Sequence, residues 1–144
     1  MKLQKNSRLA LYSILEFAAA SGRPVAAAEI AAKYGVSPHH LAKVLAELAR
    51  AGIVESIRGV GGGYRFAGNA RRLTLFDVIC HFEDLSPTDA ERREPGERTH
   101  AGLAIATVLS EIDEIAQATF KSITIATMLQ LMERQGAGRT APRS

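Results

Sequence analysis

The chain has 144 residues and a mass of 15.5 kDa, which is typical of one domain with a small extension and excludes a multidomain enzyme. Hydrophobic residues make up 47% and charged residues 23% of the sequence, values that argue against wholesale disorder, collagen-like repeats and a disulfide scaffold. The formal net charge is +3, but residues 1–72 hold 11 Lys and Arg against 4 Asp and Glu, whereas residues 73–144 hold 7 against 11. The first half is therefore the part expected to meet a polyanion.

The start of the chain shows no targeting segment. Its apolar stretch is interrupted by Ser7, Arg8, Ser13 and Glu16, so it has neither the apolar core of a signal peptide nor the length of a membrane span. The single cysteine, Cys80, excludes an internal disulfide. We therefore expect a cytoplasmic protein without a membrane partner.

Two helices are expected near the N-terminus. Apolar residues recur at three- and four-residue steps from Leu3 to Ala20, which predicts an amphipathic helix that ends before Gly22 and Pro24. A second, alanine-rich helix is expected over residues 26–34, and Gly35 ends it.

A third helix is predicted to begin at Ser37 and Pro38. A serine side chain caps free amide groups, and proline at the first helical position gives up a donor that nothing would use. The helix is expected to run to about Ala51, with an apolar stripe formed by Leu41, Val44, Leu45 and Leu48. Two short helices joined by a glycine-containing turn, the second with a cationic exposed side, are typical of a helix-turn-helix whose second helix enters the major groove of DNA.

The next residues predict a two-stranded β wing. Residues 53–57 alternate as in a strand, the glycine-rich residues 59–63 form a loop, and residues 64–66 begin a returning strand. Glycines allow the backbone to approach another surface closely, and Arg58 and Arg65 flank the loop with positive charge. This geometry suits the phosphate backbone or the minor groove. A nucleotide phosphate loop is disfavoured, because no Gly-Lys-Ser/Thr sequence closes the loop.

The second half predicts further helices. Thr74 and Asp77 form a capping box that opens a short helix through about Glu83, and helical periodicity returns near His100. The expected organisation is a winged helix-turn-helix domain over residues 1–84, a flexible loop over 85–99, a dimerisation helix and a short C-terminal helix over 100–133, and a disordered tail over 134–144. The fold class is mainly α with a two-stranded β wing.

The long helix carries an apolar row at helical spacing. Roughly twenty-four residues at about 1.5 Å each reach about 36 Å, which is longer than this small core needs. We expect the row to bury itself against the same helix of a second subunit, because readers of two half-sites need a two-fold axis. The row consists of Ile105, Leu109, Ile112, Ala116, Phe120 and Ile123.

Four segments together resemble the IscR/NsrR/CymR-type (Rrf-two) family of bacterial transcriptional regulators. They are residues 34–37, the helix over 41–52, the Arg-Gly-Val-Gly-Gly-Gly-Tyr sequence of residues 58–64, and the Leu-Thr-Leu-Phe-Asp-Val-Ile sequence of residues 73–79. The resemblance covers residues 1–133 and implies a dimeric winged helix-turn-helix regulator that binds double-stranded DNA.

The resemblance also implies where DNA is contacted. Carried over by position, the major groove would be read by Ser37, His39, His40 and Lys43, and the minor groove would be contacted by Arg58 and Gly61. The neighbouring Pro38, Gly62 and Arg65 complete the expected DNA-binding set.

Sensing members of this family bind an iron-sulfur cluster through three cysteines in the loop before the dimer helix, with a His or a carboxylate near the N-terminus. Here residues 85–99 contain no cysteine, and Arg8 stands at the N-terminal position where some members have an acidic ligand. A cation repels a metal. We therefore expect no iron-sulfur cluster, no other cofactor and no metal site.

Cys80 and His100 leave alternatives open. Cys80 is interpreted first as a small buried hydrophobe, with a redox-sensing thiol as the alternative. His100, with nearby Glu91, Glu94 and Glu97, could hold a metal, although solvated side chains are the commoner case. The adjacent His81 points away from Cys80 on a helix and adds little.

The expected function is sequence-specific DNA binding by a homodimer on a two-fold operator, with half-sites about one helical turn apart and repression as the outcome. The alternatives are a winged-helix module that binds protein, and a redox- or metal-sensing regulator that uses Cys80 or His100. No catalytic constellation emerges, so we do not expect an enzyme. The sequence leaves the control open among constitutive repression, a thiol switch, a small-molecule pocket near the loop and a partner protein.

Overall fold

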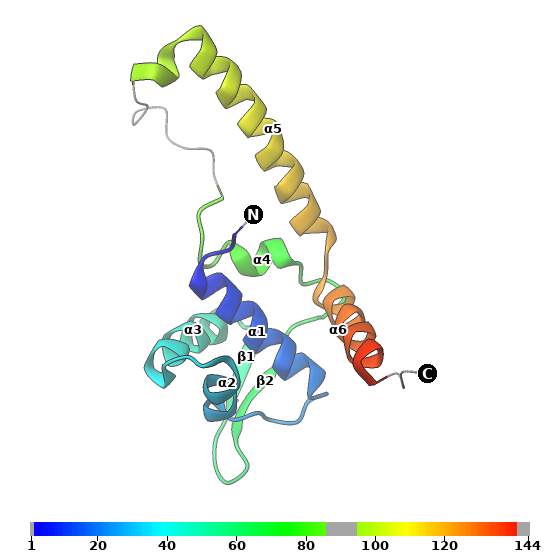
Figure 1. The fold of residues 1–144 in the computed structure, drawn as a ribbon. Helices are drawn as coiled ribbons and strands as arrows, with labels where there is room; N and C mark the ends of the chain where they lie inside the picture. Colours follow the sequence, from blue (N-terminus) through cyan, green and yellow to red (C-terminus); the bar gives the residue numbers. More distant parts are fainter. Residues whose placement is uncertain (1, 86–94, 141–144) are drawn as a thin grey trace.

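A computed structural model describes residues 2–85 and 95–140 (Figure 1). Within these ranges the chain is mostly helical, with one two-stranded antiparallel sheet, which confirms the expected fold class. In chain order the elements are α1 (Lys5–Ala19), α2 (Ala27–Tyr34), α3 (Pro38–Arg50), β1 (Val54–Ile57), β2 (Gly63–Phe66), α4 (Leu75–Ile79), the 3₁₀ helix η2 (Pro95–Arg98), α5 (His100–Ser122) and α6 (Ile125–Thr140).

Helix α1 is the centre of the core. It packs against α3, β2, α4 and α6, and its apolar side is almost completely buried. The predicted stripe of α3 is buried against it at Leu41, Val44, Leu45 and Leu48. Each buried side chain of this size contributes about 1.5–3 kcal/mol to the stability of the fold. The helix-turn-helix is therefore supported on its inner side by one shared core.

The start of α3 forms as its sequence predicts. Gly35 ends α2 in the left-handed conformation with φ of 62°, which glycine adopts without strain. The Ser37 side chain then accepts a hydrogen bond from the His40 N–H at 3.2 Å, and Pro38 takes the first helical position. The turn between α2 and α3 is thus defined at both ends.

The wing is anchored at its base. Strands β1 and β2 pair from Val54 opposite Phe66 to Ile57 opposite Gly63. The other edge of β2 pairs with the residue before α2, because Val25 and Tyr64 exchange two backbone hydrogen bonds of 2.9 Å. Gly63 has φ of 154°, and a Cβ atom there would lie 2.4 Å from the Val25 carbonyl oxygen. Only glycine fits this approach.

The capping box at Thr74 forms as predicted, with reciprocal bonds between Thr74 and Asp77. The helix it opens is shorter than expected, because α4 ends at Ile79 rather than near Glu83. Beyond Ile79, His81 and Phe82 donate their N–H groups to carbonyls three residues back. The chain therefore tightens into a turn.

Helix α5 projects away from the rest of the molecule, and α6 returns beside the domain (Figure 1). A short backbone pairing joins the two parts, because the Leu75 N–H donates to the Ile123 carbonyl and the Ile125 N–H donates to the Leu73 carbonyl, both at 2.9 Å. Ile125 is fully buried. The end of α5 and the start of α6 therefore belong to the core of the winged domain.

Two boundary predictions differ from the structure. Helix α6 continues to Thr140, so a disordered tail from residue 134 was wrong for residues 134–140, while residues 141–144 lie outside the described part. Glycine at position 136 lowers helix stability without ending the helix. The predicted flexible loop falls largely on residues 86–94, which lie outside the described residues, and its end forms η2.

Across the described ranges, no helix is long and apolar enough to cross a membrane.

We predict that Gly63→Ala destabilises the fold by about 2 kcal/mol or more, because its methyl group would collide with the Val25 backbone. Chemical denaturation of the variant measures this loss. The matched control is Gly96→Ala, where a Cβ atom meets open space, and a change within about 0.5 kcal/mol is expected. Equal stability of the two variants would contradict the anchored wing.

Candidate nucleic-acid interface

The first turns of α3 present most of the predicted major-groove residues to solvent. Ser37, Pro38, His39 and Lys43 are exposed. His40 is different, because it is half-buried and its Nε2 atom is buried with no hydrogen-bond partner among the described residues. His39 and Lys43 therefore offer an exposed ring and an exposed ammonium group that could reach a base or a phosphate, whereas the Ser37 hydroxyl caps the helix and part of the His40 ring turns toward the protein.

The predicted contact residues of the wing differ in what they do in the structure. Arg58 is exposed and forms no ion pair within the described residues, so its charge is available. Arg65 instead pairs with Glu55, directly across the strands. Gly62 shapes the loop, since its N–H bonds the Gly59 carbonyl at 3.0 Å and a Cβ atom there would lie 2.2 Å from the Ile57 carbonyl oxygen.

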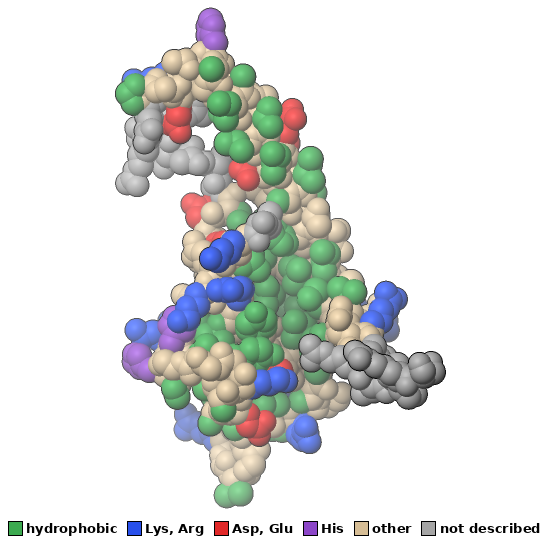
Figure 2. Space-filling model, viewed as in Figure 1, with side chains coloured by type: hydrophobic (Ala, Val, Ile, Leu, Met, Phe, Trp, Pro, Cys, Tyr) green, Lys and Arg blue, Asp and Glu red, His purple; other side chains and the backbone are tan. Residues whose placement is uncertain are grey.

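The wing tip ends in an apolar side chain between two glycines. Val60 is fully exposed, while Gly61 is exposed and has φ of 75°. Figure 2 shows this tip at the end of the molecule, and it shows histidine side chains on the α3 side beside lysine and arginine side chains. The α3 start and the wing thus form one cationic end with a narrow projecting loop.

A polar cluster that the sequence patterns did not indicate ties α1 to α2. The Tyr34 hydroxyl donates to Glu16 Oε1 at 2.6 Å, and Lys33 Nζ lies 2.6 Å from the same oxygen. Burial alone would raise the pKa of Glu16, but the bonds from Lys33 and Tyr34 outweigh it and lower that pKa. Tyr12 stacks on Tyr34 at 4.5 Å. The cluster fixes the helix that precedes the reading helix.

The predicted apolar row on α5 is split by the structure. Ile105, Leu109 and Ile112 are 53–60% exposed, as expected of side chains that pack against a second subunit. Phe120 and Ile123 instead pack against the chain's own core, and Ala116 is half-buried. Val108 and Ile115, which the spacing argument left out, are exposed beside the row by 55% and 67%.

The predicted burial of Cys80 was wrong. Cys80 is exposed, because its backbone keeps the helical conformation and its position lies opposite the side of α4 on which Leu75, Val78 and Ile79 are buried. Partial burial of the thiol nevertheless raises its pKa, and the Asp77 carboxylate raises it further. A raised pKa reduces the reactive thiolate at neutral pH.

The metal site considered at His100 gains no support in the described residues. His100 lies exposed at the start of α5, and within residues 2–85 and 95–140 no three His, Cys, Asp or Glu side chains lie close enough to hold a metal. Glu91 and Glu94 lie outside the described residues.

We predict that Cys80 is alkylated more slowly at neutral pH than the thiol of a short peptide, because its raised pKa leaves less thiolate. Mass spectrometry of iodoacetamide labelling should show a labelling rate that rises with pH. The rate should level off only at a pH above about 8.5, the ordinary pKa of a cysteine thiol. Cys80→Ser supplies the unreactive control. A rate above that of the peptide would contradict the pKa assignment.

Comparison with known proteins agrees with this geometry. Residues 3–131 match the Rrf2 family, which is described as an iron-dependent transcriptional regulator. A protein of Rhodopseudomonas palustris named as the HTH-type transcriptional regulator BadM is 46% identical over 136 residues, which cover 94% of this chain and 85% of that protein. The HTH-type transcriptional regulator IscR of Vibrio campbellii is 35% identical over 85 residues, or 58% of this chain and 51% of IscR.

Solved structures show the same architecture. CymR, the global cysteine regulator of B. subtilis, superposes with a TM-score of 0.66 at 27% identity, over 91% of this chain and 98% of CymR. T. potens IscR superposes with a TM-score of 0.70 at 23% identity, over 100% of this chain and 94% of that chain, which supports the fold alone. The chain therefore belongs to the Rrf2 family of winged-helix transcriptional regulators.

Proposed function

We propose that this regulator acts as a homodimeric repressor that binds a two-fold symmetric DNA operator without an iron-sulfur cluster. The observation that carries the proposal is the pair of exposed cations, Lys43 on α3 and Arg58 on the wing, which form no ion pair within the described residues. Phosphate groups attract such free cations and release counterions on binding. Helix α3 then occupies the major groove and the wing reaches the minor groove.

The exposed row on α5 supports a homodimer. Five aliphatic side chains, Ile105, Val108, Leu109, Ile112 and Ile115, are each more than half exposed. They recur at three- and four-residue steps and so share one side of the helix. Two copies related by a two-fold axis would bury this row against itself, which is the geometry of an isologous interface. The two α3 helices would then face half-sites about one helical turn, or about 34–36 Å, apart.

The residues of this chain do not fit an iron-sulfur cluster. Such clusters are held by several cysteine thiolates, but the sequence contains only Cys80. Cys80 is exposed at the end of α4 with a raised pKa, which disfavours the ligating thiolate. Arg8, on the exposed side of α1, places a positive charge where some relatives have an acidic ligand. We propose that this member regulates transcription without the family's iron chemistry.

For DNA binding, Lys43→Ala and Arg58→Ala should each weaken affinity for a selected operator and lower the salt slope by about 1, because each removes one phosphate contact. Fluorescence anisotropy over a salt series measures both quantities. Arg134→Ala on α6 removes the same charge away from α3 and should leave the slope unchanged. Salt-independent binding, or equal effects of all three variants, would favour a protein-binding module instead.

For dimerisation, Ile112→Asp should convert the protein to a monomer at micromolar concentration, because an unpaired carboxylate is costly to bury in an apolar interface. Analytical ultracentrifugation measures the mass. Ser110→Asp places the same charge on the exposed opposite side of α5 and should remain dimeric. A dimeric Ile112→Asp protein would place the interface elsewhere.

For the cofactor, protein purified without oxygen should show a featureless visible spectrum and no iron or sulfide, because one cysteine cannot hold a cluster. Iron and sulfide assays on the same sample complete the measurement. Stoichiometric iron and sulfide with visible bands would contradict the proposal and point to Cys80, His100 and acidic residues as ligands shared between subunits.

A further inference from the structure

A pocket of about 230 Å³ lies where the N-terminal segment, the end of the α4 turn and α5 meet. Among the described residues, the pocket is lined by Lys2, Leu3, Glu83, Asp84, Leu85, Asp113, Ala116, Gln117 and Phe120. Two bonds hold its walls together. Gln117 donates to the Leu85 carbonyl at 2.8 Å, and the Gln4 N–H donates to Glu83 Oε2 at 3.0 Å.

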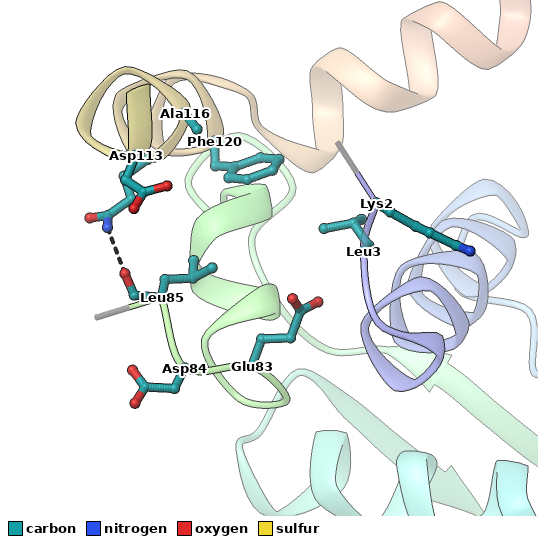
Figure 3. Close-up of a pocket in the computed structure, with 9 residues that line it drawn as sticks. Lys2, Leu3, Glu83, Asp84, Leu85, Asp113, Ala116 and Phe120 are labelled. Atoms are coloured by element: carbon teal, nitrogen blue, oxygen red, sulfur yellow. Dashed lines mark hydrogen bonds between the residues drawn. The ribbon is translucent and has the colours of Figure 1, made fainter. Parts of the chain in front are cut away.

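One side of the pocket is apolar. Leu3, Leu85 and Phe120 turn toward the central space from three different elements (Figure 3). The volume exceeds the roughly 150 Å³ of an apolar cavity that takes up benzene, and it falls below the roughly 300–1,000 Å³ of pockets for drug-sized ligands. The pocket therefore suits a molecule about the size of one substituted ring.

The charge of the pocket is negative. Among the described lining residues, the Glu83 and Asp113 carboxylates face the pocket against the one ammonium group of Lys2, and Figure 3 shows the Lys2 side chain extending away from Phe120. Glu83 is half-buried, lies beside Leu3 and keeps Oε1 free of the backbone bond made by Oε2. Asp113 supplies a second carboxylate from α5. A carboxylate beside an apolar wall favours a cation with an apolar body.

We propose that this pocket binds a small organic ammonium ion, with its apolar body against Leu3, Leu85 and Phe120 and its charged group at Glu83. A metal ion is disfavoured, because no suitable three-ligand group exists among the described residues. An anion would meet the carboxylates at close range. The Phe120 ring adds a π face that attracts cations.

The pocket is placed to regulate the protein. Its walls come from the segment that leads into α1, which packs against α3, and from α5, which carries the exposed apolar row. A ligand that bridges these walls would stabilise one arrangement of the N-terminal segment on α5. Binding itself does not require DNA, so the test below is independent of the proposed function.

Titration calorimetry on the full chain, with benzylamine as the probe, tests the proposal. Benzylamine, which is protonated at neutral pH, should bind, whereas the neutral isostere benzyl alcohol and the anion phenylacetate should bind at least about tenfold more weakly. Glu83→Gln should weaken benzylamine binding about tenfold, because a charge-assisted bond is lost. The glutamine keeps an acceptor for the Gln4 N–H, so the fold is retained.

Two further variants separate the pocket from general charge effects. Glu111→Gln removes a negative charge two residues from Asp113 but outside the lining, and it should leave benzylamine affinity unchanged. Ala116→Leu fills the pocket without changing charge and should abolish binding. Absence of benzylamine binding, equal binding of benzyl alcohol or phenylacetate, or affinity indifferent to Glu83→Gln and Ala116→Leu would overturn the proposal.

Discussion

The short backbone pairing between residues 73–75 and residues 123–125 is the constraint on which the arrangement of this molecule depends. Two 2.9 Å bonds join the entry of α4 to the junction of α5 and α6, and the fully buried Ile125 inserts that junction into the core formed around α1. The direction in which α5 leaves the domain is therefore set by the same core that supports α3. In a dimer formed through α5, the distance between the two reading helices follows from this rigid connection rather than from a linker.

Fewer cations of the winged domain are available to a ligand than its composition suggests, because some are paired with carboxylates. Of the cations in the first half of the chain, Lys33, Arg50 and Arg65 are each held by a carboxylate from Glu16, Glu47 or Glu55. Exposed pairs of this kind contribute about 1 kcal/mol or less to stability, but they withdraw charge from the surface. Within the described residues, Lys43 on α3 and Arg58 on the wing form no ion pair, and neither do several cations on other elements, so the charges of Lys43 and Arg58 stay available to a nucleic acid.

Local patterns predicted local structure well and long-range contacts poorly. The caps at Ser37 and Thr74, the stripe of α3 and the two strands of the wing follow from periodicity and turn chemistry, which act over a few residues. Cys80 was misplaced although the helical period of Leu75, Val78 and Ile79 already puts it on the opposite, outer side of α4. The Glu16 cluster and the pocket were not predicted, because each joins elements far apart in sequence. The row on α5 divides for the same reason, since only the folded core shows which half its own domain covers.

The anchoring of the wing has a thermodynamic consequence for recognition. Because β2 pairs with β1 on one edge and with Val25 on the other, and Gly63 lets the backbones touch, only the tip over residues 58–62 is free to rearrange. Ordering a residue costs about 1–2 kcal/mol in conformational entropy. A loop that folds only on contact with its target therefore has a smaller net binding free energy, because this cost offsets much of the free energy of its contacts. Here that loss is confined to the tip. In the proposed complex with DNA, a wing held in this way would act as a preformed probe of groove shape, and it would favour targets whose groove width it fits.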